Sequence, residues 1–345
     1  MKYDWLLAGL SAPICITWEV TFACNLSCEH CLSASGKSKP NELTHEQAKA
    51  MIDDLAEMGV FYINVGGGEP LMRPDFLELV EYAVSKGLPV QFSTNGTLVT
   101  EQIAKKIAVI KQVRVQVSLD GATEAINDQI RGPGSFKGAL NALELLSKSN
   151  IDFSVNMVAT RNSFGQIAEL YQLVKSYGAK FRVARLRPSG RGMDSYPYLH
   201  LTPEQNVKLY QWVKANPEVT TGDSYFILST LGEPIPGLNV CGAARATACI
   251  SPTGNVYPCA FLLNDDCLAG NIREQSLSQL WQQSELFHKF RTTRVQSCIS
   301  CQSYNECGGG CHAVSYHLKG DLFTKDPECL VGIHSGMPDQ QLKTK

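Results

Sequence analysis

Short apolar runs alternate with longer amphipathic stretches through the first two-thirds of the chain. The apolar runs are rich in valine, isoleucine and phenylalanine, which is typical of strands buried on both faces. We expect six strands, at residues 14–20, 61–65, 90–93, 113–119, 153–158 and 181–186. The stretches between them carry apolar residues three and four positions apart, the spacing that places side chains on one face of a helix.

Start and stop signals delimit several of these helices. Thr44-His-Glu-Gln47 is a capping box ahead of a periodic apolar stretch, and Gly59 provides the stop. Pro74 and Gly87 bracket the next helix, with the proline in its first turn and the glycine after its last. Further helices are expected at residues 101–110, 136–147 and 165–177, and a second capping box opens one at 202–215.

The strand and helix signals alternate in units of roughly 30 residues, which predicts an α/β fold with a parallel sheet covered by its crossover helices. Six such units are two short of the closed eightfold barrel. We therefore expect an open partial barrel, whose lateral mouth suits a large or peptidic substrate.

After the sixth strand the pattern changes and cysteines accumulate. Ser251-Pro-Thr-Gly254 predicts a turn between two short strands that sets Cys249 roughly opposite Cys259. We expect the barrel with its N-terminal lead-in at residues 1–215, a proline-containing bridge at 216–240, a small cysteine-rich domain at 241–330 and a disordered tail at 331–345.

Composition excludes several classes of partner. With 345 residues, 44% of them hydrophobic, the chain can bury the core of one large and one small domain. A formal charge of -2 provides no basic face for nucleic acid, and no apolar stretch is long enough to span a membrane. Residues 5–18 are apolar, but Asp4 beside Lys2 and the absence of a small-residue cleavage site disfavour a signal peptide. We expect a cytoplasmic protein.

Three cysteines follow the first strand at the spacing CxxxCxxC, namely Cys24, Cys28 and Cys31. Thirteen cysteines in a chain of this length would give that spacing by chance roughly 0.02 times. Disulfides are the alternative, but a chain of this size does not need them, and the grouping suits metal ligation in a reducing compartment. Three thiolates bind three irons of a [4Fe-4S] cluster, which leaves the fourth iron open to another ligand.

Unusual residues also follow the next three predicted strands, namely Gly66-Gly-Gly-Glu-Pro70, Ser93-Thr-Asn-Gly96 and Ser118-Leu-Asp-Gly121. Each of these alone is explained as a tight turn. Because the carboxyl ends of parallel strands lie at one edge of a sheet, where ligands bind, their joint placement beside CxxxCxxC indicates a site. Glycines allow the backbone to approach a ligand closely, and Glu69 can accept from an ammonium group.

These motifs together resemble the radical S-adenosylmethionine (SAM) enzymes over residues 14–187. The resemblance implies a partial (β/α)6 radical SAM barrel in which Cys24, Cys28 and Cys31 hold a [4Fe-4S] cluster and SAM chelates the open iron. It also implies SAM contacts from Gly67, Gly68, Glu69, Pro70, Ser93, Asn95, Ser118, Asp120 and Arg131. The family usually has an aromatic residue before the third cysteine, where this chain has His30. A surface imidazole and a residue that contacts adenine both stay open.

A second pattern, CxxCx5Cx3C at Cys298, Cys301, Cys307 and Cys311, also departs far from chance. Zinc is an alternative for such spacing. With Cys241, Gly254, Cys259 and Cys329, however, the pattern resembles the SPASM auxiliary-cluster domain. That resemblance implies two auxiliary [4Fe-4S] clusters, one held by Cys298, Cys301, Cys307 and Cys329 and the other by Cys241, Cys259 and Cys311.

The fourth ligand of the latter cluster is Cys249, from the hairpin geometry, or the iron stays open. Cys15 and Cys267 fit no pattern and are interpreted as buried hydrophobes. Auxiliary clusters near a substrate supply an electron sink, which favours net oxidation. Sulfatase-maturing relatives carry an aspartate directly after the cysteine that follows the turn, and Ala260 stands there in this chain. Formylglycine formation is therefore disfavoured.

The whole chain resembles the mycofactocin radical SAM maturase family, most clearly in Val60-Phe-Tyr-Ile-Asn-Val-Gly-Gly-Gly-Glu-Pro70 and Arg185-Leu-Arg-Pro-Ser-Gly-Arg-Gly192. The resemblance implies a substrate that is a small ribosomal precursor peptide ending in Val-Tyr. The tyrosine is oxidatively decarboxylated and then joined to the valine by a carbon–carbon bond. Rivals are a maturase of the quinone-cofactor or thioether-forming type and a non-catalytic iron–sulfur redox or scaffold protein.

Two kinds of partner are expected with this activity. Only 13 residues precede the first strand, so we expect a separate peptide-recognition protein and an external one-electron donor. Arg185, Arg187 and Arg191 follow the sixth strand, and we hypothesise that one of them holds the peptide's terminal carboxylate, because a guanidinium forks onto a carboxylate. The alternative is that these arginines contact SAM or solvent.

Overall fold

A computed structural model describes residues 10–221, 225–233, 235 and 240–332. Most of the tail expected at residues 331–345, and part of the bridge expected at 216–240, lie outside the described residues. In the described part of the chain no helix has the length and apolar character needed to cross a membrane.

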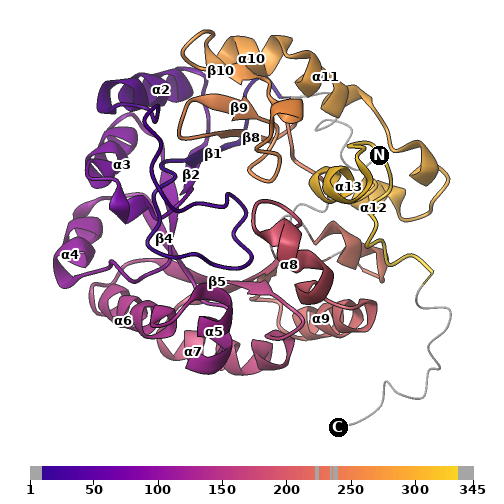
Figure 1. The fold of residues 1–345 in the computed structure, drawn as a ribbon, viewed down its shortest axis with the longest axis horizontal. Coiled ribbons are helices and arrows are strands. Elements are labelled where there is room, and N and C mark those ends of the chain that lie inside the picture. Colours follow the sequence, from indigo (N-terminus) through magenta and orange to yellow (C-terminus); the bar gives the residue numbers. More distant parts are fainter. Residues whose placement is uncertain (1–9, 222–224, 234, 236–239, 333–345) are drawn as a thin grey trace.

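One sheet organises the molecule, and its ten strands follow the order β10-β9-β8-β1-β2-β3-β4-β5-β6-β7. Helices form an outer ring around the strands (Figure 1). The barrel strands are β1 (Cys15–Glu19), β2 (Tyr62–Gly66), β3 (Val90–Thr94), β4 (Val113–Ser118), β5 (Phe153–Ala159), β6 (Lys180–Arg185) and β7 (Thr220–Thr221). All of these pair in parallel, which confirms the predicted parallel α/β barrel with six principal strands.

The predicted barrel helices are present, and their ends lie within two residues of the predicted ones. They are α2 (His45–Glu57), α3 (Phe76–Ser85), α4 (Glu101–Val109), α6 (Ser135–Lys148), α7 (Ile167–Ser176) and α9 (Pro203–Ala215). Both predicted capping boxes form, at Thr44 and at Thr202. Pro74 lies outside α3, because Asp75 occupies the N-cap position instead.

Within the described residues of the barrel part, two helices were not predicted from the sequence, α5 (Glu124–Arg131) and α8 (Gly192–Leu199). α8 lies between the sixth predicted strand and the helix predicted at 202–215, and it contains Pro197. A proline inside a helix removes one hydrogen bond, so a short helix that contains one depends on its tertiary contacts.

The two faces of the barrel sheet differ in polarity, because successive side chains of a strand alternate between them. Ile16 and Trp18 of β1, with Val65 of β2, are buried in the core shared with the helices. The opposite face carries polar side chains on successive strands, all partly exposed except the buried Gln116, namely Thr17, Asn64, Gln91, Gln116, Asn156 and Arg182. The interior of the partial barrel is therefore polar.

The cysteine-rich part continues the same sheet. Its hairpin consists of β8 (Thr247–Ile250) and β9 (Asn255–Tyr257), to which β10 (Gly270–Asn271) is added. β8 pairs in parallel with β1, so a strand of this part lies directly beside the strand that leads into CxxxCxxC. The predicted turn is present, but Cys249 pairs with Tyr257. The expectation that Cys249 lies opposite Cys259 was wrong by two residues, because the ladder closes between Ser251 N–H and the Asn255 carbonyl.

Four helices complete this part, α10 (Leu277–Gln283), α11 (Glu285–Thr292), α12 (Tyr304–Cys307) and α13 (His312–Lys319). Trp281 of α10 is fully buried and donates from its indole nitrogen to the Leu10 carbonyl at 2.8 Å. The C-terminal part thereby also contacts the chain ahead of β1.

A shared sheet predicts that the barrel and the hairpin unfold together. Ile250 is fully buried and pairs with Trp18 of β1 and Val256 of β9, so we expect Ile250→Ala to lower the free energy of unfolding by about 2–5 kcal/mol. Anaerobic urea unfolding followed by tryptophan fluorescence and circular dichroism should show one transition shifted to lower urea. Phe61→Ala, at a side chain 73% exposed, is the control, with an expected effect within about 0.5 kcal/mol. Two transitions of which only one moves would contradict the shared sheet.

Candidate functional site

The three cysteines of CxxxCxxC lie in a loop that closes on itself after β1. Cys24 N–H donates to the Gly36 carbonyl, and Gly36 N–H donates to the Phe22 carbonyl, both at 2.9 Å. Burial raises the pKa of the Cys24 thiol to about 11, and the nearby Cys28, Glu69 and Cys31 raise it further. The three thiols are thus close enough to interact, and burial makes each thiolate dependent on a positive partner such as iron.

A segment after β6 holds this loop from the other side. Arg191 donates from Nε to the Cys28 carbonyl and from Nη1 to the Ser35 carbonyl, both at 2.9 Å. Ser189 donates to the Leu32 carbonyl at 3.0 Å, and Ser195 of α8 donates to the Glu29 carbonyl at 3.2 Å. In Figure 1 the chain between β1 and α2 crosses the middle of the ring beside α8.

Arg191 therefore has a structural role. It was one of three arginines considered as ligands of a substrate carboxylate, but its guanidinium donates to two backbone carbonyls of the cysteine loop. Gly190 explains how the segment approaches so closely. At φ +56° it lies in the left-handed region, and a Cβ there would come within 2.5 Å of the Cys31 carbonyl oxygen.

The glycines after β2 pack against the backbone ahead of Cys24. A Cβ on Gly68 would lie 1.9 Å from the Ala23 carbonyl oxygen, and one on Gly67 would lie 2.7 Å from that of Thr21. Gly68 N–H donates to the Thr21 carbonyl and Glu69 N–H to the Ala23 carbonyl, both at 2.8 Å. These amides are thus engaged, which leaves acceptors, the carbonyl oxygens and the Glu69 carboxyl, as the groups suited to an ammonium.

Glu69 is buried and held by three donors. Its carboxyl accepts from Thr94 Oγ1 at 2.8 Å, from Asn95 N–H at 2.8 Å and from Leu71 N–H at 3.2 Å. Burial raises its pKa to about 7, and the three hydrogen bonds oppose that rise. A buried carboxyl whose pKa is near 7 can ionise when an ammonium group binds beside it, because the positive charge stabilises the carboxylate.

Of the other predicted SAM contacts, one touches the cysteine loop and three lie at the ends of the strands. Asn95 joins strand end three to the cysteine loop, because its Nδ2 donates to Asn25 Oδ1 at 2.8 Å. Ser93 donates to Gln116 Oε1 at 3.3 Å, Pro70 begins a short 3-10 turn, and Ser118 ends β4 on the polar face of the sheet. Their SAM-binding role stays a prediction.

Asp120, Arg131 and His30 form a buried charged group beside Cys28. The Asp120 carboxylate lies 2.6 Å from Arg131 Nε and 2.7 Å from His30 Nε2. Burial would raise the pKa of Asp120, but Arg131 and His30 outweigh it and hold that pKa well below its usual range. Arg131 also opposes the burial that raises the pKa of the Cys28 thiol. The surface-imidazole interpretation of His30 is wrong, because its side chain is 5% exposed.

The auxiliary cysteines gather in two places. Cys241 and Cys311 are buried and Cys259 is partly buried, and Cys241 and Cys311 raise the pKa of the Cys259 thiol beyond the rise that burial causes. Cys249 lies beside Glu19, Cys259 and Cys15, so it neighbours only Cys259 of this set. Whether Cys249 is the fourth ligand stays open.

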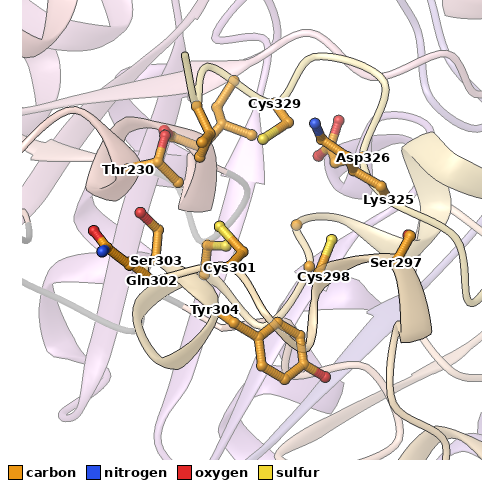
Figure 2. A pocket seen from close by; sticks show the side chains of 15 residues that line it. Thr230, Ser297, Cys298, Cys301, Gln302, Ser303, Tyr304, Lys325, Asp326 and Cys329 are labelled. Carbon is orange, nitrogen blue, oxygen red and sulfur yellow. The ribbon is translucent and has the colours of Figure 1, made fainter.

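The second set lines a cavity of about 420 Å³. Cys298, Cys301, Cys307 and Cys329 all contribute to its wall, and Figure 2 shows the sulfurs of Cys298, Cys301 and Cys329 around the central space. The thiols interact, because Cys329, Cys298 and Cys301 each raise the pKa of Cys307 beyond the effect of burial. A four-thiol set around such a space fits a [4Fe-4S] cluster.

Two further observations concern all the cysteines. All thirteen are free thiols, and Cys267 is fully buried whereas Cys15 is partly exposed. Among the described residues no three His, Cys, Asp or Glu side chains converge closely enough to hold a single metal ion. The members of each cysteine set are therefore recognised by their effect on one another's pKa.

Arg185 and Arg187 have different surroundings. Arg185 is buried and forks onto Asp326 at 2.8 and 2.9 Å, with Glu328 at 2.7 Å from its Nε. It was expected to hold a substrate carboxylate, but two carboxylates of this chain already occupy it. Arg187 stacks on the Phe261 ring and opposes the burial that raises the pKa of Cys311.

Several residues of the site were not predicted. Asp326 and Glu328 flank a proline just before Cys329, and Thr94 lies within the strand end that was quoted for Ser93 and Asn95. Glu19 ends β1 and is 3% exposed, with no hydrogen-bond partner for its Oε2 among the described residues. The sequence did contain a signal for Glu19, because a carboxyl residue stands at the end of a strand that was predicted to be buried.

Comparisons with known proteins agree with this geometry. The Radical SAM superfamily model matches residues 18–174, and the SPASM iron-sulfur cluster-binding domain model matches residues 241–307. The chain is 48% identical to mycofactocin maturase MftC of Mycolicibacterium smegmatis over 94% of this chain and 84% of that protein. It is 33% identical to the AdoMet-dependent heme synthase of Methanosarcina barkeri over 94% and 98%.

Among solved structures, Streptococcus suis SuiB bound to S-adenosylmethionine matches with a TM-score of 0.75 at 20% identity, over 95% of this chain and 79% of that one. This likeness supports the fold of the chain.

Loss of the CxxxCxxC thiols should remove one cluster and leave the others. We expect the triple variant Cys24→Ala/Cys28→Ala/Cys31→Ala to lose about a third of the iron of the reconstituted protein, because each site holds one four-iron cluster. SAM cleavage should disappear. Cys15→Ala is the matched control and should keep its iron. Full iron content in the triple variant would contradict the assignment.

The buried Glu19 predicts a dependence of stability on pH. Burial raises its pKa from 4.5 to about 7, so the folded state binds a proton that the unfolded chain releases between these values. Stability therefore falls as pH rises from about 5 to 7, by at most about 3 kcal/mol from this group. Glu19→Gln should make the fall less steep in urea unfolding at several pH values. Glu46→Gln, at an exposed residue of α2, should leave the slope unchanged, and an unchanged slope in Glu19→Gln would refute the prediction.

Proposed function

The chain belongs to the mycofactocin maturase family of radical SAM enzymes, and we propose that it modifies the C-terminal Val-Tyr of a small ribosomal precursor peptide. It is a radical SAM enzyme with a SPASM domain, and it uses SAM and [4Fe-4S] clusters. The proposed reaction is oxidative decarboxylation of the tyrosine, followed by a second SAM-dependent step that joins it to the valine through a carbon–carbon bond. The observation that carries this proposal is 48% identity over 94% of the chain.

A [4Fe-4S] cluster held by Cys24, Cys28 and Cys31 with SAM bound to it would supply 5'-deoxyadenosyl radical chemistry, which can remove a hydrogen atom from an unactivated carbon. The protein must hold the reacting parts in place and exclude water. We assign the first task to Glu69 and to the carbonyls of Gly67 and Gly68, which would receive the methionine ammonium of SAM. Cys24, Cys28 and Cys31 would ligate the cluster, with Arg131 near Cys28 as a compensating charge.

The polar interior of the barrel suits the end of a peptide. Amide side chains on neighbouring strands, such as Asn64, Gln91 and Gln116, can donate to and accept from peptide groups. Of the three arginines first considered for the terminal carboxylate, we keep Arg187 in this proposal because its guanidinium lies over the Phe261 ring. Its stacking on Phe261, two residues after Cys259, supports a position between barrel and auxiliary site.

The auxiliary clusters would receive the electron that the tyrosine loses. Decarboxylation of the radical leaves one electron beyond the hydrogen atom transferred to the deoxyadenosyl group, so an acceptor is needed. We propose Cys298, Cys301, Cys307 and Cys329 for one cluster, and Cys241, Cys259 and Cys311 for the other, with Cys249 or an open iron completing it.

Partners beyond the precursor follow from the same chemistry. We propose an external one-electron donor, which the SAM-bound cluster requires, and a separate peptide-recognition protein that delivers the precursor. A reducing compartment such as the cytoplasm is proposed because the thiols must stay available for iron.

The proposal is tested with the reconstituted, reduced protein, SAM and a precursor peptide ending in Val-Tyr. We expect 5'-deoxyadenosine and a product lighter by one CO2 and two hydrogen atoms, measured by mass spectrometry. The matched control peptide ends in Val-Phe, which lacks only the phenol oxygen. Arg187→Lys should raise the peptide KM by about tenfold or more, because lysine cannot form the bidentate contact.

Other outcomes would separate the rivals. No 5'-deoxyadenosine under any condition would favour a redox or scaffold protein. Deoxyadenosine formation with an unchanged Val-Tyr peptide, but with turnover of a different peptide or of a tetrapyrrole, would overturn the substrate assignment. The tetrapyrrole belongs in the test because one relative, at 33% identity, is a heme synthase.

A further inference from the structure

A buried network of charges joins the end of β6 to the last cysteine loop. Arg185 is 4% exposed, and Asp326 is 1% exposed. Two parallel hydrogen bonds connect them, at 2.8 Å from Nη1 and 2.9 Å from Nη2, the bidentate arrangement that fixes both side chains. This geometry is that of a guanidinium–carboxylate ion pair.

Asp326 contacts both auxiliary sites. Its Oδ2 accepts from the backbone N–H of Cys311 at 2.9 Å, and Cys311 belongs to the set with Cys241 and Cys259. Its backbone carbonyl accepts from Cys329 N–H at 3.0 Å, and Cys329 belongs to the other set. Asp326 also lines the 420 Å³ cavity. Asp326 thus contacts a ligand residue of each predicted cluster, one through its side chain and the other through its backbone carbonyl.

The chain is shaped so that Asp326 can reach this position. A Cβ on Gly310, which has φ +96°, would come within 2.2 Å of the Asp326 Cβ, so no other residue fits there without displacing the aspartate. Asp326 N–H also donates to the Gly309 carbonyl at 3.0 Å. The contact between the two loops is therefore tight on both sides.

The same network reaches the radical-generating end of the barrel. Glu328 lies 2.6 Å from Arg185 Nη2 and accepts from the hydroxyl of Tyr196. Tyr196 belongs to α8, whose Ser195 donates to the Glu29 carbonyl inside the cysteine loop. A chain of buried contacts therefore runs from CxxxCxxC through α8 and Arg185 to Cys311.

We propose that Arg185 and Asp326 are positioning residues that fix the auxiliary ligand loops against the barrel, and that their opposite charges set the reduction potential of the cluster held by Cys311. Reduction adds one negative charge to a cluster. A nearby carboxylate opposes that charge and a nearby guanidinium favours it. Removing either member of the pair therefore moves the potential, in opposite directions. This inference does not depend on the identity of the peptide.

The test is a redox titration with dithionite, followed by electron paramagnetic resonance, on the full-length protein with all clusters reconstituted. Signals that do not change on addition of SAM belong to the auxiliary clusters. We expect Asp326→Asn to raise one auxiliary potential and Arg185→Gln to lower it, each by about tenfold in the one-electron equilibrium constant, which is about 59 mV. The other auxiliary potential should move less.

Further variants separate charge from folding. Arg185→Lys keeps the charge and loses the fork, so it should lower stability and leave the potential near that of the wild type. The double variant Arg185→Gln/Asp326→Asn should bring the potential back, because the two shifts cancel. Asp75→Asn, which removes an aspartate paired with Arg73 in the barrel, is the matched control and should change neither auxiliary potential.

Shifts of Asp326→Asn and Arg185→Gln in the same direction would overturn the proposal. So would unchanged potentials in both variants with full iron content. If the single variants lose iron, the double variant decides, because it removes both charges of the pair together and leaves only the carboxylate of Glu328, whose side chain is 14% exposed. The proposal would also be contradicted by a double variant that keeps its iron but whose auxiliary potential differs from that of the wild type by as much as the shift expected for one single variant.

Discussion

The cysteine loop after β1 has no regular secondary structure, and the rest of the site depends on how its backbone is held. Buried carbonyl and amide groups must find partners, and here they find them in segments far away in the sequence. The glycines after β2 supply one side, with Gly68 so close that a methyl group would lie 1.9 Å from the Ala23 carbonyl oxygen. Arg191 and the serines of the β6–α8 segment supply the other side. The loop is therefore fixed by packing between strand ends.

The charges follow the same logic. A buried ion is tolerated when it is paired and hydrogen-bonded, and two buried arginines near the cysteines meet that condition with different partners. Arg131 pairs with Asp120 beside Cys28, and Arg185 pairs with Asp326 beside Cys311. Each pair thus places one positive and one negative charge, with no net charge, next to cysteines that are proposed to bind iron as thiolates. The auxiliary site is joined to the radical site through the β1–β8 pairing and through α8.

Much of this could be predicted from the sequence because the signals are local. The strands show as apolar runs, the helices as capping boxes, and the cysteine sets as fixed spacings. The features that could not be predicted correctly depend on tertiary contacts. Nothing local says that Arg185 meets Asp326, which lies 141 residues further on. Likewise, α8 forms despite Pro197 because the cysteine loop packs on it, and Cys249 pairs with Tyr257 because the hairpin closes at Ser251. The extension of the barrel sheet by β8 is a long-range pairing of the same kind.

In the proposed reaction, a radical made at CxxxCxxC takes a hydrogen atom from the β carbon of the terminal tyrosine of a peptide held in the barrel. The most direct measurement uses a Val-Tyr-ending precursor with deuterium at both β positions of the tyrosine, incubated with the reduced holoprotein and SAM. We predict that mass spectrometry finds one deuterium in the 5'-deoxyadenosine formed. Deoxyadenosine without deuterium, alongside decarboxylated peptide, would contradict the claim.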